Sequence, residues 1–144
     1  MTKDRDRLQS LTNKSCPVGW TMFSGSFYFL SSLSDSWTNA RRDCQNKGAD
    51  LVVIDSLKEQ NFLSELINVD TWIGLSDRDK EGTWKWVDES PLIFTNWDNG
   101  EPNNLKPDGE DCAEIRVQKG HKWNDKPCEL SQRWICEKKC NTGK

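Results

Sequence analysis

A long stretch without a regular hydrophobic pattern, residues 92–111, constrains the fold of this chain more than any other feature. It holds about twenty residues, follows Pro91 directly and contains Pro102 and Pro107. A loop of this length in a compact domain is usually functional or disordered. Two features favour a functional loop: its polar oxygens suit a metal site, and Cys112 closes it. The remaining chain is therefore expected to form a scaffold that presents this loop.

The side chains in and near this loop are mainly oxygen donors, with carboxylates and amides and no His. Ca²⁺ takes about 6–8 oxygen ligands at roughly 2.3–2.6 Å. Together with the backbone carbonyl of Asp125, the candidate side chains supply about six oxygens. These side chains are Glu101, Asn103, Glu110, Asn124 and Asp125. About two positions then stay open for an outside ligand, and a sugar with two adjacent hydroxyls fills both.

The length of 144 residues predicts one domain with a real core. Charged residues make up 30% of the chain with a net charge of −3, which argues against a nucleic-acid binder with a basic face. Only 34% of the residues are hydrophobic, so the eight Trp residues are expected to carry much of the burial.

The six Cys residues form an even set without a Cys-x-x-Cys pair. This pattern favours a disulfide framework in an oxidising compartment over a zinc site or a redox motif. No apolar run reaches membrane-spanning length, and no signal peptide follows Met1. We therefore expect an extracellular fragment with an added start Met.

Two helices are predicted before the loop. The first begins after Ser36 as N-cap, covers residues 37–47 and ends at Gly48 as C-cap. The second begins with the capping box Ser56 to Glu59. The expected core-facing residues are Trp37, Ala40 and Cys44 in the first helix and Phe62, Leu63, Leu66 and Ile67 in the second.

Segments rich in Trp, Ile, Val and Thr predict the strands. They are residues 26–30, 51–54, 71–75, 83–87, 112–117 and 133–137. The expected fold class is therefore α+β, with two helices against antiparallel strands and one long functional loop.

An ordered set of motifs extends over about residues 16–138. The set consists of Cys16-Pro17, Trp20, Cys44, Trp72-Ile73-Gly74-Leu75, Glu101-Pro102-Asn103, Cys112, Trp123-Asn124-Asp125, Cys128 and Cys136. It resembles the C-type lectin family, specifically the mannose-type carbohydrate-recognition domain of DC-SIGN-like and fish type II receptors. The chain departs from the longer form of the family in having Phe27 where a second Cys is usual, and in a loop about two residues longer near Asp108.

The resemblance implies two calcium sites. The principal site uses Glu101, Asn103, Glu110, Asn124 and Asp125, which also contact the sugar. At each open position a sugar hydroxyl coordinates the ion, donates its hydrogen to a carboxylate and accepts a hydrogen from an Asn amide. The auxiliary site uses Asp77, Glu81, Asn104 and Asp111. For residues 77–81 the alternative is a solvated turn.

The same resemblance implies the disulfides Cys44–Cys136 and Cys112–Cys128. Cys16 and Cys140 are left, and they either bridge the chain ends or pair between subunits; the even Cys count favours the internal bond. The expected organisation is a tail or the end of a stalk in residues 1–15, the carbohydrate-recognition domain in residues 16–140, and a tail in residues 141–144.

The leading functional hypothesis is Ca²⁺-dependent binding of mannose, fucose or N-acetylglucosamine glycans, on microbes or glycoproteins, by the extracellular head of a pattern-recognition or adhesion receptor. The whole protein is expected to be a type II membrane receptor, or alternatively secreted, with oligomerisation through an upstream stalk. A protein-binding domain of the same fold is the second hypothesis. A glycosidase with Glu101 and Glu110 as its carboxylate pair is the third. It is disfavoured because a metal-bound carboxylate is a poor proton donor, so we expect no enzyme.

Two further side chains near the site are assigned from their context. Trp123 precedes two candidate ligands, and we interpret it as a packing residue beneath the site. His121, the only His, has no Ser or Cys pattern near it and is interpreted as a surface residue.

Overall fold

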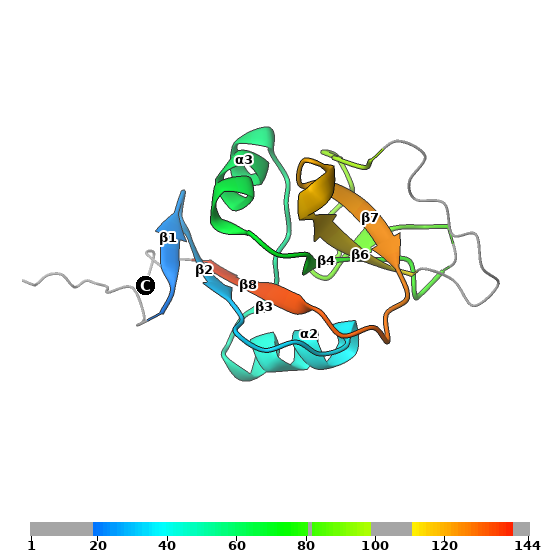
Figure 1. The fold of residues 1–144 in the computed structure, drawn as a ribbon, viewed down its shortest axis with the longest axis horizontal. Coiled ribbons are helices and arrows are strands. Elements are labelled where there is room, and N and C mark those ends of the chain that lie inside the picture. Colours follow the sequence, from blue (N-terminus) through cyan, green and yellow to red (C-terminus); the bar gives the residue numbers. More distant parts are fainter. Residues whose placement is uncertain (1–18, 81, 99–110, 140–144) are drawn as a thin grey trace, which may run out of the picture.

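A computed structural model describes residues 19–80, 82–98 and 111–139 (Figure 1). Within them, eight strands form one sheet with the order β1-β2-β8-β4-β6-β7, to which β3 adds beside β8 and β5 beside β4. The strands are β1 (Thr21–Phe23), β2 (Ser26–Leu30), β3 (Asp50–Leu51), β4 (Thr71–Ser76), β5 (Lys85–Trp86), β6 (Cys112–Arg116), β7 (Lys122–Lys126) and β8 (Arg133–Lys139). The helices are α2 (Trp37–Asn46), α3 (Leu57–Leu66) and the short 3-10 helix η1 (Val117–Lys119).

Strand β8 joins the two halves of the sheet. It pairs antiparallel with β2 and β3 and parallel with β4. Successive residues of a strand point to opposite faces of the sheet. Both faces of β8 are covered by other parts of the chain. Ile135 packs in a cluster with Leu63 of α3, whereas Trp134 and Cys136 pack in a cluster with Ala40 of α2. The two helices lie on opposite sides of β8 in Figure 1.

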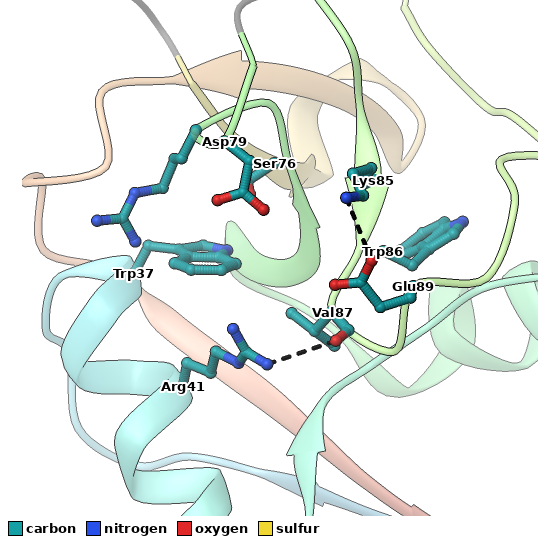
Figure 2. Close-up of a pocket in the computed structure, with 9 residues that line it drawn as sticks. Trp37, Arg41, Ser76, Asp79, Lys85, Trp86, Val87 and Glu89 are labelled. Atoms are coloured by element: carbon teal, nitrogen blue, oxygen red, sulfur yellow. Dashed lines mark hydrogen bonds and ion pairs between the residues drawn. The ribbon is translucent and has the colours of Figure 1, made fainter.

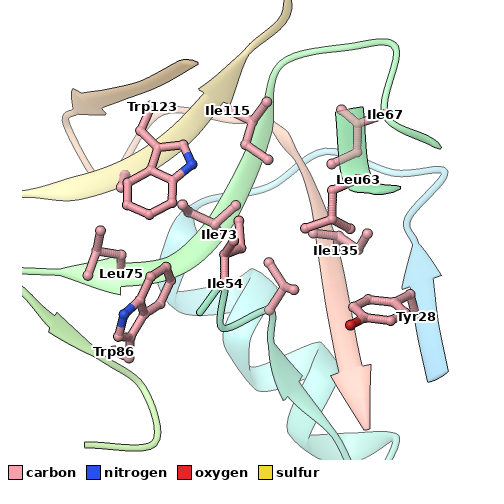
Figure 3. Packing of buried hydrophobic residues seen from close by; sticks show 12 residues of the cluster. Tyr28, Ile54, Leu63, Ile67, Ile73, Leu75, Trp86, Ile115, Trp123 and Ile135 are labelled. Atoms are coloured by element: carbon pink, nitrogen blue, oxygen red, sulfur yellow. The ribbon is translucent and has the colours of Figure 1, made fainter. Parts of the chain in front are cut away.

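The large aromatic side chains carry the core, as the composition predicts. Trp72, Trp86 and Trp123 are fully buried, and Trp86 and Trp123 meet edge to face with ring centroids 5.5 Å apart. Figure 3 shows these two rings beside Ile73 and Leu75 of β4. Edge-to-face aromatic pairs stabilise a core by about 0.5–1.5 kcal/mol beyond the area that they bury.

Both predicted helices are present. Ser36 caps α2 by accepting a 3.3 Å hydrogen bond from the backbone N–H of Asn39, and Ser56 caps α3 in the same way through Glu59 at 3.1 Å. The helix α2 ends at Lys47 as C-cap, one residue before the predicted Gly48. The capping box of α3 is half formed, since the Glu59 carboxylate accepts from Asp55 N at 3.1 Å instead of from Ser56.

The strand predictions need three corrections. The predicted strand 51–54 pairs as a strand only at Asp50–Leu51, because beyond it Val52 N donates to Ile135 while its carbonyl accepts from Gly74 N. The strand predicted at 83–87 is limited to β5. Strands β1 and β7 were not predicted, and β7 has the sequence Lys-Trp-Asn-Asp-Lys, which is poor in typical strand residues.

Two disulfides connect the described residues. Cys44–Cys136 joins α2 to β8, and Cys112–Cys128 joins the start of β6 to the segment after β7. Their Cα–Cα distances of 5.4 and 5.2 Å are in the usual range, and both pairings agree with those implied by the resemblance. Cys16 and Cys140 lie outside the described residues.

Candidate functional site

Strand β7 carries Asn124 and Asp125, the two principal-site candidates that lie within the described residues. Asn124 and Asp125 are 3% and 0% exposed, and they pair with Glu114 and Ala113 of β6. The sequence placed these residues at the site but not on a strand. Pairing with β6 gives their backbone a regular set of hydrogen-bond partners, so both side chains are held on a rigid element.

The segment that precedes residues 99–110 is anchored directly to β7. Asp98 N donates to the carbonyl of Trp123 at 2.9 Å, and Trp123 N donates to the carbonyl of Asn96 at 2.8 Å. Residues 96–98 of the long loop therefore lie beside β7, next to Asn124 and Asp125. Residues 99–110, with Glu101, Asn103, Asn104 and Glu110, and also Glu81, lie outside the described residues.

The other end of the loop is anchored to β4. The carbonyl of Asp111 accepts a 3.0 Å hydrogen bond from the backbone N–H of Asp77, and Cys112 then begins β6. Asp77 is 2% exposed, and its Oδ2 accepts from Gly82 N at 2.8 Å. The alternative of a wholly solvated turn is therefore wrong for Asp77, while Asp79 and Lys80 are exposed.

The carboxylate of Asp111 supplies a test of whether a cation suits this region. Its Oδ1 is buried and has no hydrogen-bond partner within the part of the chain that the structure describes. A buried carboxylate oxygen without a partner carries a desolvation penalty that a bound cation would offset. The hard oxygen donors present fit Ca²⁺ in kind. Among residues 19–80, 82–98 and 111–139, no group of three or more His, Cys, Asp or Glu side chains is placed to hold a metal ion, so the described ligands alone do not complete a site.

A buried carboxylate that the sequence reasoning missed lies directly behind Asn124. Glu114 has a fully buried side chain, and its Oε2 accepts from Asn124 Nδ2 at 2.8 Å. Arg116 Nε lies 3.3 Å from Oε2, and Lys126 Nζ lies 3.7 Å from Oε1. Burial raises the pKa of Glu114, while the Asn124 hydrogen bond and the charge of Lys126 act in the opposite direction. The sequence does contain a signal for this residue, because an acidic side chain stands between Ala113 and Ile115 in a predicted strand.

Trp123 packs under this region and does not form a sugar platform, as predicted. It is fully buried, contacts the rings of Phe94 and Trp97, and donates from Nε1 to Gln60 Oε1 at 2.8 Å. The interpretation of His121 as a surface residue is wrong. His121 is half-buried, and its Nε2 lies 2.8 Å from the carbonyl oxygen of Ile67.

A separate polar cavity of about 310 Å³ lies between α2 and the β4–β5 connection (Figure 2). Its cationic side chains already have partners. Arg41 pairs with Asp50 at 3.0 Å, and Lys85 pairs with Glu89 at 3.2 Å. Arg78 lies over the Trp37 ring with its Cζ 5.4 Å from the centroid. Because these cations are engaged in this way, the described lining of the cavity offers no free cationic group for an anion.

The fold and these motifs match known proteins. The Lectin C-type domain model matches residues 33–138. The chain is 49% identical over 131 residues to the CD209 antigen of Papio hamadryas, covering 87% of this chain and 35% of that protein. The chain therefore spans about a third of the length of this curated relative.

Two solved structures share the fold. One is the cow C-type carbohydrate-recognition domain of CD23, solved in the presence of GlcNAc2Man3 oligosaccharide, with a TM-score of 0.82, 38% identity, and coverage of 87% of this chain and 96% of that chain. The other is a calcium-independent type II antifreeze protein with a TM-score of 0.80, 31% identity, and coverage of 86% and 94%.

This chain belongs to the C-type lectin domain family. Its two helices, mixed sheet and two disulfides are those of a C-type lectin fold, and its sequence places it near the CD209 antigens. The family consists of binding domains and not of enzymes, which removes the glycosidase hypothesis. The calcium-independent relative shows that the fold alone does not establish a calcium site.

Proposed function

We propose that this chain is a calcium-dependent carbohydrate-binding domain for mannose, fucose or N-acetylglucosamine glycans, with residues 16–140 as the carbohydrate-recognition domain. The observation that carries the proposal is the buried pair Asn124 and Asp125 on β7, beside the anchored start of the segment that contains Glu101-Pro102-Asn103. Two ligands on a rigid strand that is bonded to Asp98, three residues before Glu101, support an ion shared with the loop motif.

The residues that would hold the principal ion are Glu101, Asn103, Glu110, Asn124 and Asp125. Bound Ca²⁺ would supply two coordination positions for adjacent sugar hydroxyls. The chain's own side chains would orient those hydroxyls, because Glu101 and Glu110 accept hydrogens and Asn103 and Asn124 donate them. An auxiliary ion would be held by Asp77, Glu81, Asn104 and Asp111, and the buried Oδ1 of Asp111 supports it.

We further propose that the domain is the extracellular head of a pattern-recognition or adhesion receptor, of type II membrane topology or secreted. Both disulfides suit an oxidising compartment. No helix in the described segments is long and apolar enough to cross a membrane. Since a shallow site binds single sugars weakly, an oligomer formed through an upstream stalk would supply avidity.

The test combines calcium titration by calorimetry with a glycan array, run with and without EDTA. The wild-type protein is expected to bind Ca²⁺, and to bind mannose-type glycans only without EDTA. Asp125→Asn removes one negative charge at the site and should abolish both. Glu129→Gln removes one charge from an exposed position and should change neither. Array binding that persists in EDTA, or no binding of either ligand, would overturn the proposal, and the latter would favour a protein-binding domain.

A further inference from the structure

We propose that Glu114 is a positioning residue that fixes the side-chain amide of Asn124, with Nδ2 toward β6 and Oδ1 toward the candidate calcium site. This inference rests on the proposed calcium-dependent sugar binding, in which Asn124 is a ligand. Glu114 is not itself one of the candidate ligands.

The placement of the two residues makes the contact short and fixed. Glu114 and Asn124 are directly paired residues of the antiparallel strands β6 and β7, so their side chains lie on the same face of the sheet. The hydrogen bond from Asn124 Nδ2 to Glu114 Oε2 is 2.8 Å long. Both residues are almost completely excluded from solvent, at 0% and 3% exposure. Water therefore competes little for this bond.

The chemistry of Glu114 determines which end of the Asn124 amide faces it. The oxygen and nitrogen ends of an Asn amide have nearly the same shape, so packing alone does not choose between its two orientations. The Glu114 carboxylate is surrounded by donors and acts as an acceptor. Arg116 Nε donates to the same Oε2 at 3.3 Å, and Lys126 Nζ lies 3.7 Å from Oε1. The flipped amide would place its oxygen against the carboxylate, so Glu114 selects the orientation with Nδ2 inward.

The selected orientation leaves Asn124 with an acceptor and a donor, which are the groups that a sugar site needs. In a planar amide, one N–H lies on the same side as the carbonyl oxygen and the other points away from it. With one N–H held by Glu114, Oδ1 and the other N–H of Asn124 stay available to an ion and to a sugar hydroxyl. Glu114 therefore sets Asn124 as a donor to the sugar, which is the role that the mannose-type account assigns to it.

Glu114→Gln is the most informative variant. It keeps the shape of the side chain but no longer selects one orientation of the Asn124 amide. An Asn–Gln pair forms a hydrogen bond in either orientation when both amides flip together. Glu129→Gln is the matched control, since it makes the same substitution at an exposed position and leaves the Glu114–Asn124 bond intact. Calcium dissociation constants are measured by calorimetry with CaCl₂ alone, and the Asn124 side-chain amide is followed by NMR in the calcium-free protein.

We expect Glu114→Gln to weaken calcium binding about tenfold or more, as loss of the partner of a metal ligand commonly does. Glu129→Gln should stay within about twofold, as is usual for a surface substitution away from the site. In the calcium-free wild-type protein, one Nδ2 hydrogen of Asn124 should exchange slowly with solvent, and this protection should be lost in Glu114→Gln. If Glu114 had only a structural role, Glu114→Gln would lower the melting temperature. The protection of the Asn124 side-chain amide would then change no more than that of the surrounding backbone amides.

Equal calcium affinity of Glu114→Gln and wild type, or an unprotected Asn124 amide in the wild-type protein, would overturn the positioning role. The second readout remains decisive if Glu114→Gln fails to fold, because it uses the wild-type protein. Failure of the proposed function is distinguishable, since the wild-type protein would then bind no calcium while the amide signal still decides the role of Glu114.

Discussion

The Tyr28 hydroxyl donates a 2.7 Å hydrogen bond to Glu59 Oε2, which joins β2 to α3 through two buried side chains. Glu137 of β8 completes this group, because it accepts from Ser26 Oγ at 2.8 Å and adds a second negative charge. Burial raises the pKa of Glu59 to about 7, and the Tyr28 hydrogen bond opposes this rise. Lys139 lies beside the group and contacts Glu137 at 3.0 Å.

The raised pKa of Glu59 predicts a pH-dependent stability. Between pH 4.5, the ordinary pKa of a free Glu, and about 7, the folded protein binds more protons at Glu59 than the unfolded chain does. The contribution of Glu59 is therefore fully present below this window and is lost as the pH rises to about 7. The loss amounts to about 3 kcal/mol of the free energy of unfolding. Denaturant titrations at several pH values measure it.

Glu59→Gln should remove this part of the slope, because Gln does not titrate. Glu65→Gln, on the exposed face of the same helix, is the control and should keep the wild-type slope. A slope in Glu59→Gln that equals the wild-type slope would show that Glu59 titrates normally in the folded protein.

Gly74 lies where β4 passes the chain at Val52, and the contact predicts that Gly74→Ala destabilises the fold. An ideal Cβ at Gly74 would lie 2.7 Å from the carbonyl oxygen of Val52 and 2.8 Å from that of Leu51. Because both atoms belong to the backbone, the strands must move apart, at a cost of roughly 1–3 kcal/mol. Chemical denaturation measures the cost. It should persist in a Val87→Ala background, and full rescue there would mean that the side chain of Val87 is the true obstacle.

The disulfide Cys112–Cys128 is predicted to support calcium binding as well as stability. The bridge closes a chain segment with a sequence separation of 16, so its removal by a double Ala variant should cost about 3 kcal/mol. It also ties the end of the long loop to the segment after β7, so calcium affinity of the folded variant should fall. Calorimetry on the folded protein checks this.

The second disulfide supplies the control for that experiment. Cys44–Cys136 closes a sequence separation of 92, so the corresponding double variant should lose more stability, about 4–5 kcal/mol. It joins α2 to β8, which carry no candidate ligand. Equal losses of calcium affinity in the two folded variants would show that destabilisation in general lowers the affinity. The Cys112–Cys128 bridge would then have no specific effect on the site.

The donor and acceptor pattern of the site predicts a change of sugar preference. Glu101→Gln combined with Asn103→Asp keeps the size and the oxygen ligands but exchanges acceptor and donor on one side of the site. The double variant should lose mannose binding and gain weak galactose binding, with calcium affinity little changed. A glycan array with calcium titration tests it, and a continued preference for mannose would contradict the donor–acceptor account.

The helices and the oxygen-rich loop were predictable from the sequence because their signals are local. Ser36 and Ser56 sit before apolar stripes of period 3.6, and these patterns place α2 and α3 without knowledge of the fold. The Cys pairings and the candidate ligands came from ordered motifs, and both pairings that fall within the described residues are present.

Tertiary structure alone decided the features that depend on residues far apart in the sequence. Strand β7 forms from a polar sequence because β6 and residues 96–98 supply its hydrogen-bond partners. Glu59 satisfies the local capping pattern only in part, because one carboxylate oxygen accepts from Asp55 N and the other from the buried Tyr28 of β2. Glu114 meets Asn124 only when two strands align. A local pattern indicates which local conformation a residue favours. Burial and cross-strand register determine which residues it contacts, and both depend on the whole chain.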